Sequence, residues 1–140
     1  MDIKVLNAFL KEFQNESDRA AAVLAVCFLD NMIDSVLERF FIQEPKFVGK
    51  RILGSSSLVA INSFAKKIRI AFALGLLRRE EYEALEVIRG IRNDFAHELH
   101  GLSFKNGSIR DRCKNLRVAK MVMKGPLSKV KYTDTPRKRF

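Results

Sequence analysis

The stretch "IRGIRNDFAHELH", residues 88–100, decides the fold class and also holds most of the functional groups of interest. Its apolar residues Ile88, Ile91 and Phe95 recur every three or four positions, which is the spacing of one face of an α-helix. The polar side chains between them include both histidines of the chain. The stretch therefore predicts a helix with one inward face and a dense set of polar groups on the rest of its surface.

The same periodicity continues on both sides of this stretch. Apolar residues at helical spacing predict four long helices, at about residues 3–13, 18–42, 57–74 and 80–100. Ser17 is the expected cap of the second helix, Ser56 or Ser57 that of the third, and Gly75 suits the position just after the third. A short basic helix follows Ser108, and the chain after "KGP" has little apolar content.

Because strand-like alternation is absent, we predict an all-α protein. The expected architecture is a single-domain helical bundle of four main helices plus a short basic C-terminal helix, over residues 1–125. Residues 126–140 are predicted to form a basic tail. The second helix is apolar almost all round in its first half, so we expect it to be the most buried one.

The charge is divided unevenly along the chain. Residues 1–104 hold equal numbers of basic and acidic residues, so residues 105–140 carry the whole net charge of +10. This asymmetry predicts a polyanion or an acidic protein as a partner of the C-terminal quarter, with a solvated tail as the alternative. The candidate binding residues are Lys105, Arg110, Arg112, Lys114, Arg117 and Lys120.

Two observations bear on the compartment. The longest apolar run, Ala20 to Leu29, is too short to span a membrane, and the first residues lack the features of a signal peptide. Cys27 lies in an apolar stretch and is expected in the core, while Cys113 lies among cations. We therefore expect a cytoplasmic protein with reduced thiols and no membrane contact.

Metal binding and nucleophilic catalysis are both poorly supported. Asp94, His97 and His100 could contact a cation, but the only further ligands would come from the row Asp30, Asp34 and Glu38. The Glu-x-x-His motifs of helical di-iron proteins are missing. No serine lies in a nucleophile elbow, and no basic group is placed to activate Cys27. We expect no metal and no cofactor.

Phosphate chemistry fits the stretch better. Arg92 could hold a phosphate bidentately, and neutral His97 could accept a proton from a ribose 2′-hydroxyl, with Asn93 between them. The two side chains are about 140° apart round the helix, so they do not share one face, but near the helix end both can border one groove. The alternative is a structural network, in which Arg92 pairs with Asp30, Asp34 or Glu38. Asn93 and His97 would then bond carbonyls at the helix end, and we favour a carbonyl as the partner of His97.

Several phrases of the chain resemble the signature of the mannitol operon repressor (MltR-like) family. They are residues 70–77, Glu81–Tyr82, residues 91–97 and Ser103–Phe104, in the family's order and spacing, and the closing "DTPRKRF" also fits. The resemblance covers roughly residues 18–140. It implies an all-α regulator without enzymatic activity, and the chain would end where the family usually continues with another helix.

The phrase "RNDFAH" is also similar to the Arg-x4-His motif of HEPN domains, which are all-α and often dimeric. In active HEPN ribonucleases the Arg, the following polar residue and the His form the cleavage site. The resemblance implies these roles for Arg92, Asn93 and His97.

Three functions follow as expectations. The first is a non-enzymatic MltR-like regulator, a repressor or accessory factor that acts through protein partners, because no helix-turn-helix with a polar recognition helix is evident. The second is a HEPN-type metal-independent endoribonuclease, whose basic segment gathers RNA. The third is an antitoxin or immunity-type protein that binds an acidic partner. A homodimer is compatible with each of them.

Overall fold

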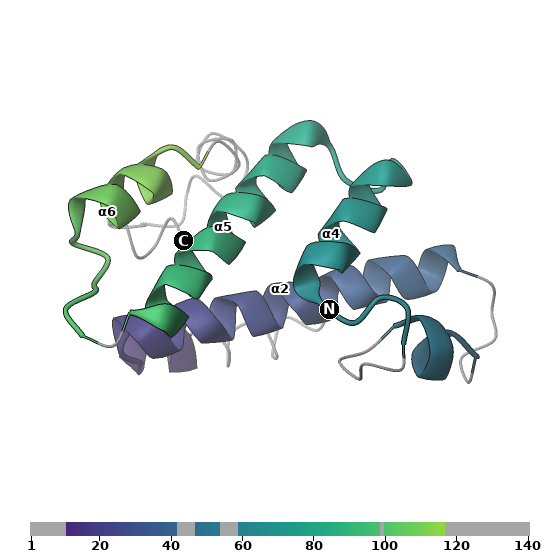
Figure 1. Cartoon of the computed structure of the whole chain (residues 1–140), viewed down its shortest axis with the longest axis horizontal. Helices are drawn as coiled ribbons and strands as arrows, with labels where there is room; N and C mark the ends of the chain where they lie inside the picture. Colours follow the sequence, from purple (N-terminus) through teal and green to yellow (C-terminus); the bar gives the residue numbers. More distant parts are fainter. Residues whose placement is uncertain (1–10, 42–46, 54–58, 99, 117–140) are drawn as a thin grey trace. The chain divides into compact units, whose positions relative to one another are not determined.

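The computed structural model describes residues 11–41, 47–53, 59–98 and 100–116. These form the helices α2 (Asp18–Phe40), α4 (Phe64–Ala73), α5 (Arg79–His97) and α6 (Gly107–Lys114), and a π-helical turn, η1 (Val48–Ile52) (Figure 1). Residues 11–15 are also helical, and no strand occurs in the described ranges. The predicted all-α helical bundle is confirmed.

The chain divides into two compact units. Within the described ranges, the first comprises the residues up to 26 and those from 90 onward, and the second comprises the residues between 27 and 89. The helices α2 and α5 each run from one unit into the other. Most of the first predicted helix and the tail at 126–140 lie outside the described residues, so both stay predictions.

Serine and glycine define the ends of two helices. Ser17 caps α2 as predicted, because the backbone N–H of Ala20 donates to its Oγ at 3.2 Å. At the end of α4, Gly75 has a φ of 72° and donates to the carbonyl of Phe72 at 2.9 Å. Leu76 donates to the carbonyl of Ala71 at 2.9 Å, which completes a Schellman motif. The predicted role of Gly75 is therefore confirmed.

The start of α4 lies later than predicted. Ser56 and Ser57 lie outside the described residues, and the cap is Ser63, whose Oγ accepts from Lys66 N at 3.4 Å. The residues before it are held extended, because Ile61 N donates to the carbonyl of Ile52 at 2.7 Å. This bond belongs to a parallel bridge between Leu53 and Ile61, which competes with the helix. Likewise α6 begins at Gly107 after Asn106, before the predicted cap Ser108.

Each unit has its own core. In the unit of residues 27–89, fully buried Leu37 of α2 and Ile68 of α4 are accompanied by apolar residues of η1, the bridge and α5. In the other unit, Ile91 and Phe95 of α5 are buried together with Ile109 and Cys113 of α6. The Phe95 and Phe104 rings pack with their centroids 5.1 Å apart.

The prediction that Cys27 lies in the core is wrong: Cys27 is exposed, whereas Cys113 is buried. The apolar character of α2 goes all round its first half, so neighbouring residues alone could not tell which side of that helix Cys27 occupies. On α6, Cys113 lies four positions after the buried Ile109, on the inward side of a helix whose other side chains are mostly charged.

By length and composition α2 could cross a membrane, although only 33% of its most apolar window is buried in the structure. A search for uninterrupted apolar runs misses this helix, because Asp30, Asn31 and Asp34 interrupt the run. The core helix of a soluble protein meets the same criterion. Location in the cytoplasm therefore stays a prediction.

Candidate functional site

The Arg-x4-His residues lie on the last turns of α5. Arg92 and Asn93 are half-buried, and His97, the last residue of the helix, is exposed. Their side chains make no hydrogen bond or ion pair with any described residue. Our expectation that His97 bonds a backbone carbonyl is therefore wrong within the described part of the chain. The imidazole meets solvent.

Other residues hold the end of α5 in its place. The guanidinium of Arg19, at the start of α2, donates from Nη2 to the carbonyl of Glu98, just after the helix. The neighbouring Asp18 accepts from the backbone N–H of Phe104 at 3.0 Å. These two contacts satisfy the carbonyl of Glu98 and the backbone N–H of Phe104. The imidazole of His97 is therefore not needed as a hydrogen-bond partner for either group.

An ion pair joins α6 to α5 beside the motif. Arg112 donates from Nη2 to the carboxylate of Asp94. Its Nη1 lies 3.6 Å from the position that a Cβ on Gly90 would occupy, so the guanidinium extends along one turn of α5 from residue 90 to residue 94. Its Nε is buried without a hydrogen-bond partner among the described residues. Arg112 is therefore only partly satisfied.

The other predicted basic residues are more exposed than Arg112. Lys105, Arg110 and Lys114 are exposed, and Arg110 contacts the adjacent Asp111 at 3.2 Å. Such an exposed pair contributes little to stability. Arg117 and Lys120 lie outside the described residues. The described part of the predicted binding segment therefore offers three exposed cations and one that is held by Asp94.

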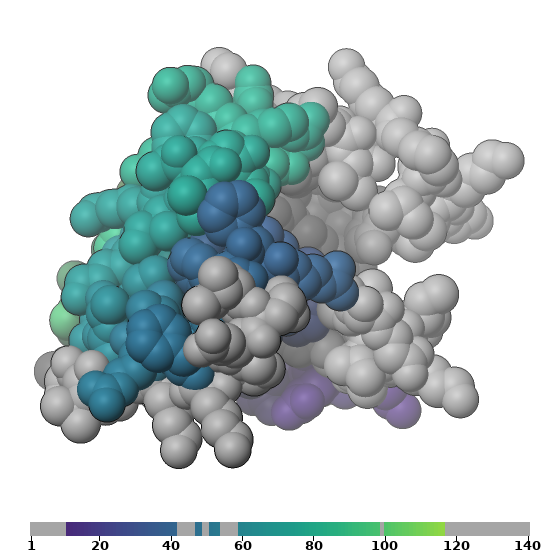
Figure 2. Space-filling model, turned by 90° about the vertical axis from the view of Figure 1, so that its right-hand side faces the viewer, coloured from purple at the N-terminus to yellow at the C-terminus, as the bar shows by residue number. Residues whose placement is uncertain are grey.

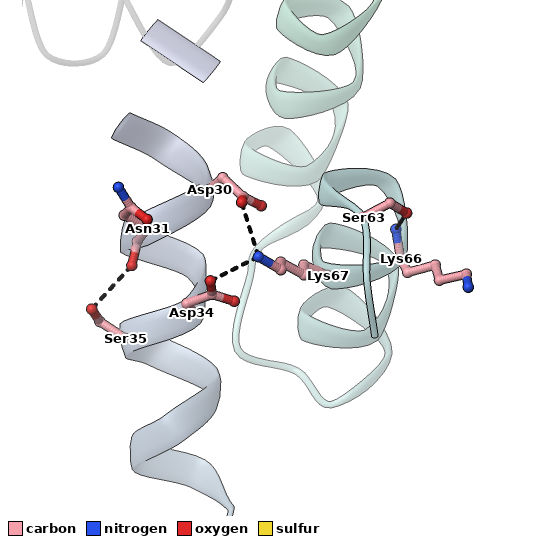
Figure 3. Close-up of polar contacts among 7 residues, drawn as sticks. All are labelled: Asp30, Asn31, Asp34, Ser35, Ser63, Lys66 and Lys67. Atoms are coloured by element: carbon pink, nitrogen blue, oxygen red, sulfur yellow. Dashed lines mark hydrogen bonds and ion pairs between the residues drawn. The ribbon is translucent and has the colours of Figure 1, made fainter. Parts of the chain in front are cut away.

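A second polar cluster lies in the unit of residues 27–89. The ammonium of Lys67, on α4, donates to Asp30 Oδ2 at 2.9 Å and to Asp34 Oδ2 at 2.7 Å (Figure 3). Only 3% of Lys67 is exposed. The other carboxylate oxygen of each aspartate is buried without a hydrogen-bond partner. The cluster thus holds two negative charges against one positive charge.

Opposing effects act on the pKa of Lys67. Burial of the ammonium lowers the pKa, while the hydrogen bonds to Asp34 and Asp30 and the charges of both carboxylates raise it. The net result is a pKa above its ordinary value of 10.5. Lys67 is therefore a cation throughout the neutral range, and its role is to neutralise the acid row.

This cluster differs from the network predicted from the sequence. Asp30 and Asp34 both pair with Lys67, whereas Arg92 lies in the other unit and pairs with no described residue. Glu38 is exposed. Lysine side chains usually lie at the surface, so the buried position of Lys67 on α4 is unusual. Its position three residues after the buried Phe64 and four before the buried Ala71 is the signal that could have placed it inside.

No group of three or more His, Cys, Asp or Glu side chains in the described ranges is arranged to hold a metal ion. The chemistry that the described groups can perform is of two kinds. His97 can exchange a proton with a bound molecule, and the cations of α6 can hold an anion.

Comparison with known proteins gives no match: no family model, no curated protein and no solved structure is significantly similar to this chain.

Proposed function

We propose that the protein is a non-enzymatic MltR-like regulator that acts through protein partners. The observation that carries the proposal is a row of exposed apolar side chains on the C-terminal half of α2. Met32, Val36 and Phe40 follow one another at intervals of four residues, and all three are exposed. Figure 2 looks onto this end of α2, which is blue there, beside the teal surface of α4.

The position of this row supports contact with a protein. Side chains four residues apart lie on one side of a helix, so the three residues form a continuous strip. Ile33 and Leu37, on the neighbouring side of α2, are already buried in the unit's own core. The strip is therefore additional apolar surface, and contiguous exposed apolar surface is typical of sites where another protein binds.

The short helix α6 argues against direct reading of DNA by the described part of the chain. It has eight residues, of which Ile109 and Cys113 are buried, and Arg112 is held by Asp94. A recognition helix needs several free polar side chains on one exposed face to reach the base edges. Repression through a partner protein fits these features better than repression through DNA contact.

Site-specific photo-crosslinking tests this proposal. A photoreactive amino acid replaces Val36 in one variant and Ser35 in a matched control, which is the exposed neighbour on the polar side. We expect one defined protein adduct in cells from position 36 and none from position 35. Equal adducts from both positions, or no adduct from position 36, would rule out the strip as the contact surface.

A second function is favoured by one observation, the exposure of His97. A HEPN-type ribonuclease requires an imidazole that a 2′-hydroxyl can reach, and His97 is exposed and without a partner in the described part of the chain. In this reaction His97 accepts the proton of the ribose 2′-hydroxyl, and the 2′-oxygen attacks the adjacent phosphorus to form a 2′,3′-cyclic phosphate. The bond from phosphorus to the 5′-oxygen of the next nucleotide breaks, and that oxygen leaves with a proton from water. The nucleophile therefore comes from the RNA and not from the protein.

The ribonuclease proposal is tested by incubating total RNA with the protein in EDTA. The control is the Arg92→Ala, His97→Ala double variant, checked by circular dichroism for wild-type helix content. Cleavage by the wild type alone supports the enzyme. If neither protein cleaves, the second function is rejected and the regulator proposal is unaffected.

A further inference from the structure

We infer that Arg112, and not Arg92, is the guanidinium that works with His97, and that together with Asn93 they form a binding site for a phosphodiester of single-stranded RNA. This inference rests on the second of the two proposed functions for the identity of its ligand. It assigns the anion-binding role to a residue of α6, outside the Arg-x4-His phrase.

The first argument is the geometry of α5. Residues on a helix are separated by about 100° each, so Asn93 and Asp94 lie about 40° and 60° from His97 round the axis. Arg92 lies about 140° away from it. Arg92 also follows directly after the fully buried Ile91, so it borders the inward side of the helix. Arg92 and His97 therefore leave α5 on different sides, and Arg92 is the less suited guanidinium for an anion bound at His97.

The second argument is the position of Arg112. Its guanidinium is held over residues 90 to 94 of α5 by the ion pair with Asp94. Residues 90, 93, 94 and 97 all lie on one side of the helix. Arg112 thus brings a positive charge to the side of α5 that bears Asn93 and the exposed His97. No other described side chain is bonded to Asp94.

The third argument is the unused hydrogen-bonding capacity of Arg112. A guanidinium has five N–H donors, and only Nη2 is engaged with a described residue. The side chain is 34% exposed, while Nε is buried, so the exposed donors are those of the terminal nitrogens. A phosphate that arrives here can accept from these donors and from the Asn93 amide. Asp94 holds the guanidinium in place and also competes for it.

Because Asp94 competes with the phosphate for Arg112, replacing Arg112 and replacing Asp94 should change the affinity for RNA in opposite directions. The probe is a short, fluorescein-labelled single-stranded RNA with methylated 2′-hydroxyls, which binds but cannot be cleaved. Fluorescence anisotropy gives its Kd for the wild type and for four single variants. We expect Arg112→Gln to weaken binding about tenfold, because a charge-assisted hydrogen bond is lost. Arg92→Gln should change Kd less than about twofold, because a charge that does not contact the bound phosphate contributes little to its binding.

Asp94→Asn separates ligand binding from a structural role. If Arg112 binds the phosphate, removal of the competing carboxylate tightens RNA binding, by about threefold or more. If the Arg112–Asp94 pair is only structural, Arg112→Gln and Asp94→Asn both lower the stability of the protein, and neither changes the Kd for RNA. Arg110→Gln is the control for charge alone, since Arg110 is exposed on the same short helix.

The outcomes also separate this inference from the ribonuclease proposal. Binding with the predicted variant pattern but without cleavage of unmodified RNA supports the site and rejects the enzyme. Cleavage by the wild type, with Arg92→Gln binding worse than Arg112→Gln, supports the enzyme and overturns the inference. Absence of RNA binding by the wild type overturns both.

Discussion

Replacement of Lys67 by Met is the most direct test of how the second half of α2 is held. Met keeps a long apolar side chain at this buried position of α4 and removes the positive charge. Asp30 and Asp34 would then face each other across one helical turn with no cation between them. In each aspartate Oδ2 would lose its bond to Lys67, and Oδ1 is already buried without a hydrogen-bond partner. Neither carboxylate therefore keeps a hydrogen bond that would offset the loss.

The magnitude follows from the burial of the three groups. Removal of one partner from a fully buried ion pair costs about 3–5 kcal/mol. Lys67 is almost completely buried, but the side chains of Asp30 and Asp34 are 30% and 24% exposed, so water partly solvates them after the change. We therefore expect the free energy of unfolding to fall by about 2–3 kcal/mol. The folded fraction relative to the unfolded fraction falls by about 30- to 150-fold.

Urea denaturation followed by circular dichroism at the helix band measures this change. The control is Lys66→Met, because the Lys66 side chain is exposed and its ammonium donates to one described residue, Asn62, at Oδ1 and 2.9 Å. Its effect should stay within about 0.5 kcal/mol. A further Asp30→Asn, Asp34→Asn change in the Lys67→Met protein should restore stability to within about 1 kcal/mol of the wild type. The reasoning is refuted if Lys67→Met is as mild as Lys66→Met, or if the neutral triple variant stays as unstable as Lys67→Met.

Three other predictions concern pH and packing. The raised pKa of Lys67 means that its contribution is complete below the ordinary value of 10.5 and is lost as pH rises through the higher folded pKa. The stability difference between wild type and Lys67→Met should therefore be constant from neutral pH to pH 10 or so and shrink above it, and a constant difference up to strongly alkaline pH would contradict this. Phe95→Ala should cost about 3–5 kcal/mol in urea denaturation, because the ring is fully buried against Phe104, and a cost under about 1 kcal/mol would show that the site collapses. Gly75→Ala should lower the free energy of unfolding by about 1 kcal/mol, because an alanine is strained at a φ of 72°. No atom lies within 4 Å of the added Cβ, so a clash does not contribute. Gly107→Ala, at the start of α6, is the control and should not lower stability.

The sequence was sufficient to predict the helices but not every side of them. The 3–4 spacing of apolar residues placed Ile88, Ile91 and Phe95 correctly, because those residues recur on one face over several turns. Helix ends followed from side-chain chemistry where the cap was unambiguous, as at Ser17 and Gly75. The start of α4 was misplaced, because the bridge between Leu53 and Ile61 is a tertiary contact that no local pattern reveals.

The candidate site was predicted less completely for a physical reason. Sequence spacing gives the angle between residues on one helix, so the separation of Arg92 and His97 could be worked out in advance. The partners of charged groups come from other helices, and spacing does not specify them. The partner of the acidic residues on α2 is therefore Lys67 and not the predicted Arg92. Arg112 of α6 pairs with Asp94 on α5, a contact that spacing along one helix does not predict. Lysine is rarely buried, so the residue type of position 67 predicts an exposed side chain, whereas Lys67 is buried.

Complementation of a strain that lacks this protein tests the central claim that it is a regulator acting through protein contacts. Transcript levels are measured after expression of the wild type, the Arg92→Ala, His97→Ala variant, or a variant with Met32→Gln and Val36→Gln on the α2 strip. Both variants must match the wild type in helix content and abundance. The account predicts that the Arg92, His97 variant restores the wild-type transcript pattern and that the strip variant fails to do so. The opposite result, with restoration by the strip variant and failure of the Arg92, His97 variant, would contradict it and favour the ribonuclease.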